Sequence, residues 1–247
     1  MQARQHANMA VVQKALLSLW HLNEDNEAKV NLSKPLTYVD RLRIRQPGDN
    51  GFNLPLQIDG GGIERWLEPT YRQVYRHILN GDWPDYDPFE ADYRSEAIMK
   101  ESGYANGYSF FRAFQGWLTL SPSGPGSGTL RVLPLLKEAT AYWILRPFMS
   151  DVPRDLFPGC YPAKTLHITE KWHQLLADHL VSIPDISPGD TVWWHPDTVR
   201  NILKMYSCNE KNGLITVFPP TMQCPPARSL RKLYLFRADN IKALKIV

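Results

Sequence analysis

Prolines and glycines interrupt this chain along its whole length, and they limit how long any regular element can be. Twenty prolines and fifteen glycines are spread over 247 residues instead of being gathered into one tract. Because proline ends helices and both residue types favour turns, this pattern predicts many turns and short elements. An all-β or α+β fold fits it better than long helices. With 43% hydrophobic residues, residues 1–247 are expected to form one domain with a continuous core.

Charge and cysteine content narrow the function classes. The 28 basic and 25 acidic residues are mixed throughout and leave a net charge of +3, so no strong field is available for nucleic acid or an anionic membrane. A small-molecule substrate or a small carboxylate remains a suitable partner. Three cysteines, Cys160, Cys208 and Cys224, share no CxxC spacing, which is typical of reduced thiols in an intracellular protein. No apolar run of about 18 residues occurs, and we expect a soluble, cytoplasmic protein.

Apolar spacing predicts where the regular elements lie. Apolar residues at three- and four-residue steps predict the longer helices, at residues 7–20, 63–79, 133–149 and 169–180, and a short helix is expected within 83–97. Alternating or continuous apolar runs between turn residues predict the strands, within residues 41–45, 52–58, 108–136 and 181–199. Beyond Arg200 the pattern degrades into a tail with an irregular run at 218–229 and a weak strand or helix at 232–247.

Four stretches of the sequence resemble, in order, the signature blocks of one family. They are residues 3–20, 36–66, 111–134 and 187–199, which include the motifs LTYVDRLRIRQPGDN and SPGDTVWWHPDTV. On these blocks the chain is identified as a member of the YbiU-like family of bacterial and fungal proteins, which is similar to the phytanoyl-CoA dioxygenase branch of the iron(II)/2-oxoglutarate oxygenases. The resemblance implies an α+β, mainly β fold: a double-stranded β-helix (jelly-roll, cupin-like) with flanking helices.

The resemblance also implies that part of the family fold is missing. Relatives carry early barrel strands ahead of the block that begins here at Gln2, and the tail 201–247 no longer resembles the family's last strands. We therefore expect the C-terminal part of an oxygenase-like β-helix domain that lacks N-terminal strands, a truncated, misassembled or degenerate copy. Such a loss would expose sheet edges.

The metal positions implied by the resemblance are altered in this chain. Oxygenases of this type hold iron(II) with two histidines and one carboxylate. The His-x-Asp motif falls on Gln57, Ile58 and Asp59, and the distal histidine position falls on Arg200. Glutamine offers only a weak amide oxygen and arginine has no lone pair to donate, so Gln57 and Arg200 are degenerate metal positions. We expect the Arg200 guanidinium to occupy the vacated cation position and to pair with Asp59 without metal.

His195 is the other candidate metal ligand, five residues before Arg200 in the same strand region. Residues an odd number apart face opposite sides of a strand, so both would point inward only if a bulge intervenes at Pro196. In the family this histidine belongs to the WWHPD motif beside the distal ligand, which implies a structural role near the site.

Arginines are the candidates for binding the 2-oxoglutarate carboxylate, which needs a bidentate basic partner. Arg131 and Arg228 are the proposed cofactor-binding residues, with Arg146 and Arg231 as alternatives. Arg131 and Arg146 come from middle strands, and Arg228 and Arg231 come from the tail that no longer resembles the family's last strands. The sequence does not distinguish among these four arginines.

Three functions remain open. The first is an iron(II)/2-oxoglutarate-dependent oxygenase-like protein, with Asp59 and His195 as ligands if activity survives and a small-molecule substrate under the Gly60–Gly62 loop and the Trp117 strand. The second is a non-catalytic pseudoenzyme or binding module that holds a small carboxylate between arginines. The third is a fragment without function as an isolated chain. Binding of iron would separate the first function from the second.

Overall fold

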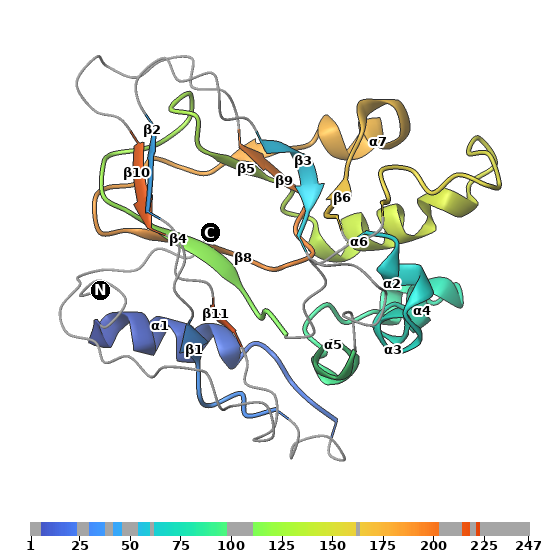
Figure 1. Ribbon diagram of the computed structural model, residues 1–247, viewed down its shortest axis with the longest axis horizontal. Coiled ribbons are helices and arrows are strands. Elements are labelled where there is room, and N and C mark those ends of the chain that lie inside the picture. The colour runs from blue at the N-terminus through green and yellow to red at the C-terminus, as the bar shows by residue number, and fades with distance from the viewer. Residues whose placement is uncertain are drawn as a thin grey trace.

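The computed structural model describes residues 6–23, 30–37, 42–45, 54–59, 62–97, 111–161, 164–202, 214–217 and 221–222. Within these ranges short helices are combined with antiparallel sheets (Figure 1). The helices are α1 (Ala7–Leu17), α2 (Glu64–Leu67), α3 (Pro69–Gln73), α4 (Arg76–Leu79), η3 (Trp83–Asp85), α5 (Asp92–Glu96), α6 (Leu136–Leu145), η5 (Arg146–Phe148) and α7 (Glu170–Ala177). The strands are β1 (Leu36–Thr37), β2 (Leu42–Arg45), β3 (Leu54–Ile58), β4 (Gln115–Thr119), β5 (Leu130–Val132), β6 (Leu166–His167), β7 (Val181–Ser182), β8 (Thr191–Trp194), β9 (Arg200–Ile202), β10 (Leu214–Val217) and β11 (Thr221–Met222).

Within the described residues the named strands form one sheet of four strands, one of five and one of two. Their orders are β2-β10-β4-β8, β6-β3-β9-β5-β7 and β1-β11, and every pairing is antiparallel. These sheets do not close into a barrel over the part of the chain described. The expected mixed fold with antiparallel sheets is confirmed at this level. No helix in the described ranges is both long and apolar enough to cross a membrane.

A hydrophobic cluster joins the four-stranded sheet to the five-stranded sheet. Trp117, Val192 and Trp194 contribute from β4 and β8, and Leu130 and Ile202 contribute from β5 and β9. Alternation along β8 explains this placement, because successive residues of a strand point to opposite faces. The two sheets therefore face each other across a shared apolar layer.

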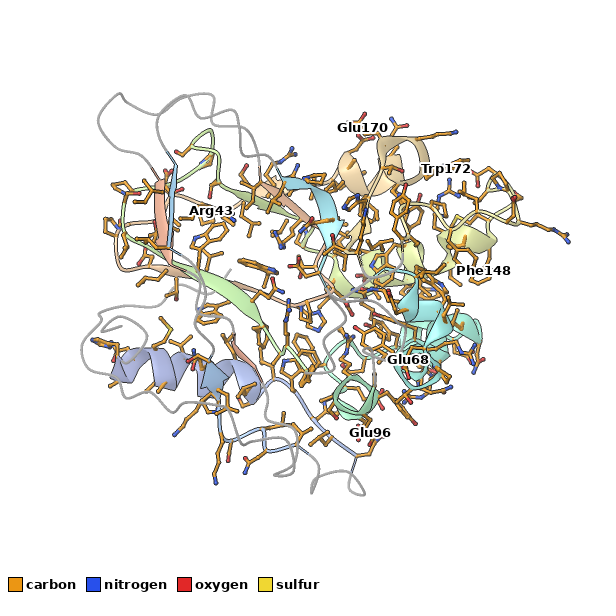
Figure 2. All side chains as sticks on the ribbon, viewed as in Figure 1. Arg43, Glu68, Glu96, Phe148, Glu170 and Trp172 are labelled. Carbon is orange, nitrogen blue, oxygen red and sulfur yellow. The ribbon has the colours of Figure 1, made fainter. Side chains whose placement is uncertain are left out.

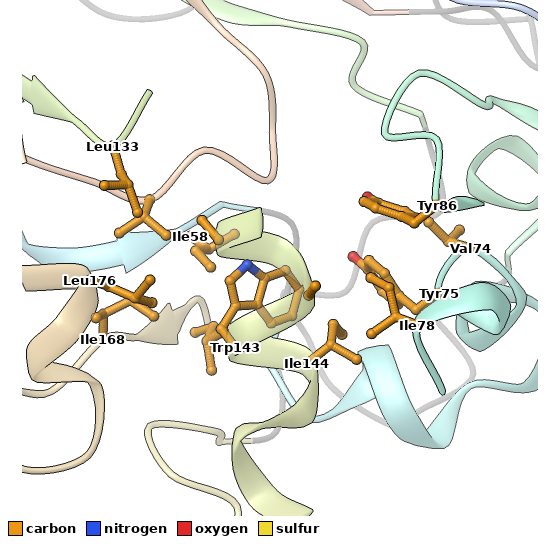
Figure 3. Close-up of a cluster of buried hydrophobic side chains, with 14 of the residues drawn as sticks. Ile58, Val74, Tyr75, Ile78, Tyr86, Leu133, Trp143, Ile144, Ile168 and Leu176 are labelled. Atoms are coloured by element: carbon orange, nitrogen blue, oxygen red, sulfur yellow. The ribbon is translucent and has the colours of Figure 1, made fainter. Parts of the chain in front are cut away.

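The helices bury two further clusters. On one side, α1 packs against the segment 111–114 and against Trp193. On the other, α6 packs against the helices α2 to α4, and Figure 3 shows Trp143 of α6 beside Ile144, with Tyr75 and Ile78 nearby. Trp143 is fully buried, with its ring 5.5 Å from that of Tyr75. This second cluster anchors the helices that carry part of the candidate site.

The segment 63–79 differs from the single helix expected there, because it forms the three short helices α2, α3 and α4. Proline lacks a backbone N–H and disfavours helical dihedrals at the preceding residue. Accordingly, Glu68 before Pro69 is extended (φ −73°, ψ 119°), ends α2 and serves as the N-cap of α3 by accepting a hydrogen bond from the Tyr71 amide. The apolar spacing was helical, but proline divides the helix.

The helix expected at 169–180 is present as α7, with a different start from the one predicted. Thr169 occupies the N-cap position, but its side chain makes no capping hydrogen bond. Instead, its backbone amide donates to His173 Nδ1 at 3.1 Å, and His173 interrupts the helix with φ −132° and ψ 32°. Figure 2 shows Glu170 and Trp172 on this first turn. The remaining predicted helices are confirmed as α1, α5 and α6, and α6 is followed directly by η5, which contains Pro147.

The tail is more regular than its sequence pattern suggests. β9, β10 and β11 all lie at or beyond Arg200, and they contribute one strand to each of the three sheets. β10 lies between β2 and β4, and β11 falls inside the run 218–229 that was expected to be irregular. Strands as short as two to four residues carry too little periodicity to be recognised alone. The predicted weak element at 232–247 lies outside the described residues.

Gly159 offers a stability test of the loop that precedes β6. Its φ is +71°, and a Cβ there would overlap the backbone carbonyl of His167. We expect Gly159→Ala to lower the free energy of unfolding by about 2–3 kcal/mol, from backbone strain plus overpacking. Gly81 has φ +94° with open space around it, so Gly81→Ala should cost only about 1 kcal/mol. Urea unfolding measures both losses of free energy, and equal losses for the two variants would contradict this explanation.

Candidate functional site

Arg200 and Asp59, two of the positions that the resemblance assigns to one metal site, form a buried ion pair. Asp59 follows β3 directly, Arg200 begins β9, and Gln57 is paired with Arg200 in the register of the two strands. Arg200 Nε lies 2.7 Å from Asp59 Oδ2, and Nη2 lies 2.6 Å from Oδ1. Both side chains are less than a tenth exposed. The expected pairing of Arg200 with Asp59 is therefore confirmed, and it is bidentate, the strongest geometry for a guanidinium and a carboxylate.

Further donors saturate the Asp59 carboxylate. Trp194 Nε1 donates to Oδ2 at 3.1 Å and Gln57 Nε2 donates to Oδ1 at 3.3 Å. The amide of Gln115 satisfies its neighbours when its nitrogen lies toward Asp59 Oδ2, at 2.7 Å, and its oxygen toward Arg112 Nη1, at 3.2 Å. The Arg200 guanidinium also lies 4.9 Å from the Trp194 ring. Strands β3, β4, β8 and β9 thus all contribute to one centre.

This donor set does not fit iron(II). Of the two-histidine, one-carboxylate set that such a site uses, only Asp59 is present, and both its oxygens accept hydrogen bonds from Arg200. Gln57 directs its amide nitrogen, which cannot ligate a metal, at the same carboxylate. Within the described ranges, no group of three or more His, Cys, Asp or Glu side chains could hold a metal ion. The centre is built to neutralise a carboxylate with protein cations and dipoles.

His195 has partners away from Asp59. Its Nε2 lies 3.0 Å from the Pro88 carbonyl oxygen, and its Nδ1 accepts the Asp197 amide at 3.1 Å. The ring is stacked on that of Trp20 at 4.9 Å between centroids. Its neighbour Trp194 points to Asp59, so the alternation predicted along this strand places His195 on the other side. With both ring nitrogens engaged there, His195 acts as a structural residue.

A second buried polar centre, which the sequence analysis missed, surrounds Asp197. Arg65 Nη1 and Arg94 Nη2 each lie 2.7 Å from a different oxygen of this carboxylate. The Tyr75 hydroxyl lies 3.3 Å from Oδ2 and also contacts Arg65, and the Tyr86 hydroxyl accepts from Arg94 at 3.0 Å. Figure 3 shows these two tyrosines side by side. Asp197 and Arg65 were included in the family blocks, but nothing in those blocks marked them as buried partners.

The Asp197 carboxylate of the second centre is ionised, and the tyrosines Tyr75 and Tyr86 beside it are not. Burial alone would raise the pKa of Asp197, but the charges of Arg94 and Arg65 outweigh burial and hold that pKa well below its usual range. Burial raises the pKa values of Tyr75 and Tyr86, so both hydroxyls stay neutral. Two guanidinium groups therefore share one ionised carboxylate. Arg65 Nη2 reaches the backbone oxygen of Asp59 at 3.5 Å, which links the two centres.

The other predicted site residues make contacts of their own or lie outside the described residues. Arg131 on β5 donates to the Leu180 carbonyl at 2.9 Å, and Arg146 forms a bidentate ion pair with Asp151 at 2.6 Å. Arg228, Arg231, Gly60 and Gly61 lie outside the described residues. Trp117 is buried between the sheets with its ring 5.5 Å from that of Trp194.

The buried histidines predict how stability depends on pH. Burial lowers the pKa of His195 to about 3 and, together with the charge of Arg146, lowers that of His173 to about 4. Because both values lie below the unfolded value of 6.5, the unfolded chain binds protons that the native state does not. We expect stability to fall by about 1.4 kcal/mol per pH unit for each histidine as the pH decreases from about 6 to about 4.5.

Variants of these residues test the assignment. His195→Gln and His173→Gln should each remove about half of the slope of unfolding free energy against pH in that window. Urea unfolding of the wild type and of each variant at a series of pH values measures this slope. A slope that neither substitution changes would show that other groups control the acid sensitivity.

Comparison with known proteins places the chain in a family. The sequence profile of the Gig2-like family matches residues 1–227. This chain belongs to the Gig2-like family. A relative from Escherichia coli (strain K12), Uncharacterized protein YbiU, is 41% identical to it over 202 residues, which are 82% of this chain and 48% of that protein. The expected YbiU-like membership is therefore confirmed.

Solved structures of similar proteins share the fold of this Gig2-like chain. A hypothetical protein of Escherichia coli, JW0805, superposes on this chain with a TM-score of 0.82 at 38% identity. The superposition covers 92% of this chain and 55% of that protein. A protein of Salmonella typhimurium LT2, described as a proposed oxidoreductase, superposes on this chain with a TM-score of 0.75 at 38% identity. The superposition covers 91% of this chain and 52% of that protein. The chain thus spans about half the length of the relatives it matches.

Proposed function

We propose that this chain is a metal-independent pseudoenzyme of the Gig2-like family, which binds a small carboxylate and does not oxidise it. The observation that carries the proposal is the bidentate Arg200–Asp59 ion pair at the position where the oxygenase resemblance expects iron(II). A cytoplasmic location and a small-molecule ligand, in place of nucleic acid, belong to the same proposal. They rest on the mixed charges and the odd number of cysteines.

The fold part of the proposal is a double-stranded β-helix. It is supported by two antiparallel sheets that share one apolar layer, to which both sheets contribute side chains. Jelly-roll domains pack two such sheets face to face. The polar centre around Asp59 also lies where strands of both sheets contribute side chains, since Trp194 belongs to one sheet and Arg200 to the other.

The energetics of the ion pair argue against exchange of Arg200 for a metal. A metal ion at Asp59 would have to separate a guanidinium and a carboxylate that are both buried. Leaving one member of such a pair without its partner typically costs about 3–5 kcal/mol. The side chains that surround Asp59 are donors and provide no imidazole to repay that cost.

Binding of a carboxylate is supported by the second centre. Two guanidinium groups there share the Asp197 carboxylate, and the buried Nε and Nη1 of Arg94 have no acceptor. A buried donor without an acceptor is costly. The carboxylate group of a small molecule would supply acceptors.

Oxidation is the second candidate function, and one observation favours it. The Salmonella typhimurium relative is described as a proposed oxidoreductase. In that case iron(II) and 2-oxoglutarate, the cosubstrates implied by the oxygenase resemblance, would bind this chain through a ligand set different from the expected one.

An anaerobic titration with iron(II), with and without 2-oxoglutarate, separates the two functions. We expect no iron to remain after desalting and no visible charge-transfer band. Stoichiometric retention by the folded wild-type protein would overturn the proposal. The Asp59→Asn variant is the control, because iron that it still retains would be bound at another position.

A further inference from the structure

Arg94 and Trp20 present buried donors without acceptors. Arg94 uses Nη2 for Asp197 and Tyr86, while its Nε and Nη1 have no hydrogen-bond partner. Trp20 Nε1 also lacks a partner. Both residues are at most 5% exposed, and the guanidinium carbon of Arg94 lies 5.6 Å from the Trp20 ring. Unpaired buried donors are uncommon in native proteins, and one explanation for them is a bound ion or water.

The same pair of residue types already binds a carboxylate elsewhere in this chain. Around Asp59, an arginine and a tryptophan indole N–H both donate to one carboxylate, with the Arg200 guanidinium carbon 4.9 Å from the Trp194 ring. Arg94 and Trp20 repeat this arginine and tryptophan arrangement, and no carboxylate of the described residues accepts from Trp20 Nε1 or from Arg94 Nε and Nη1.

The geometry of the donors indicates the class of acceptor. The arginine and tryptophan around Asp59 bind a carboxylate, whose two oxygens in one plane match the donors of a guanidinium. Asp197 occupies only the Nη2 of Arg94, so a carboxylate group from a ligand would supply acceptors for its remaining donors. The rings of Phe89, Phe111 and Phe114 pack around Trp20.

We propose that Arg94 and Trp20 form the binding site for the carboxylate group of a small ligand. This inference rests on the proposed binding function, but it uses residues that are not part of the Asp59 centre. It names the ligand class as a monocarboxylate, with Arg94 supplying the charge and Trp20 supplying a hydrogen bond.

Thermal unfolding of the purified chain with acetate tests the site, with chloride and sulfate compared at constant ionic strength. Acetate at ten times its dissociation constant should lower the unfolding equilibrium constant about elevenfold. Trp20→Phe keeps the aromatic packing and removes only the indole N–H, so it should weaken acetate binding at least about tenfold. Arg94→Lys keeps a cation for Asp197 and should also abolish most of the effect.

Trp143→Phe is the matched control. Trp143 is a buried tryptophan whose Nε1 has no partner, beside the arginine Arg65, whose carboxylate partner is Asp197. Its acetate response should equal that of the wild type. If Trp20→Phe and Arg94→Lys leave the acetate response unchanged, acetate binds elsewhere. That result would overturn this site but not the proposal that the chain binds a carboxylate. An equal response to sulfate would overturn the ligand class, and no response beyond that to chloride would overturn both the site and the binding function.

Discussion

Replacement of Arg200 by methionine is expected to lower the free energy of unfolding by about 3–5 kcal/mol, because it leaves the Asp59 carboxylate buried without its cation. Arg200 supplies two of the hydrogen bonds to that carboxylate, and both side chains are less than a tenth exposed. Methionine keeps much of the aliphatic volume, so the loss reports the charge and its hydrogen bonds. Urea unfolding of the variant and the wild type measures the difference.

The control for this substitution is Arg76→Met. Arg76 also makes a bidentate ion pair, with Glu90 at 2.8 and 2.9 Å, but its side chain is 29% exposed. Water and salt screen such a pair, and its loss should cost about 1 kcal/mol or less. The double variant Asp59→Asn, Arg200→Met should recover much of the stability lost in Arg200→Met, since no buried charge then remains unpaired. Similar losses for Arg200→Met and Arg76→Met would show that burial does not set the strength of the ion pair.

Introduction of histidine at both degenerate positions is expected to create a metal site. Gln57 and Arg200 are register partners on β3 and β9, and both side chains contact the Asp59 carboxylate. The double variant Gln57→His, Arg200→His would therefore bring two imidazoles and one carboxylate together, the set that iron(II) accepts with open positions. We expect near-stoichiometric iron(II) after anaerobic desalting, against none for the wild type, as measured by metal analysis.

Asp59→Asn in the same double-histidine background is the control, and it should abolish retention because the anionic ligand is lost. Circular dichroism should show that each variant is folded. A folded double-histidine variant that retains no iron(II) would mean that β3 and β9 do not hold the three side chains in a ligating arrangement. The oxygenase interpretation of the Asp59 centre would then lose its support.

The Arg200–Asp59 pair was predictable because the family resemblance assigned both residues to one metal site, and their charges are opposite. The rest of that centre was not. Trp194 and Gln115 reach Asp59 from β8 and β4 of the other sheet. Their contribution depends on how two sheets face each other, and alternation along a single strand leaves that open.

The centre around Asp197 shows the same limit more strongly. Arg65 and Arg94 lie in short helices, where an arginine has the same local pattern whether it is buried or exposed. Their common partner follows Arg65 by 132 positions and Arg94 by 103. Long-range packing alone selects these two arginines from the 28 basic residues of the chain.

The sequence by itself determined that the helices and strands are short, and to which side of a strand each side chain points. Pro69 and Pro147 lie where helices divide or end, and residues 192–194 alternate between the cluster of the sheets and the cluster of α1, because these effects act between neighbours in the chain. Only the tertiary structure decided that the tail supplies a strand to each sheet and that Trp194 and Gln115 add donors to the Arg200–Asp59 pair. Those outcomes depend on contacts between distant segments, such as the 141 positions that separate Arg200 from Asp59, and burial gives such contacts their strength.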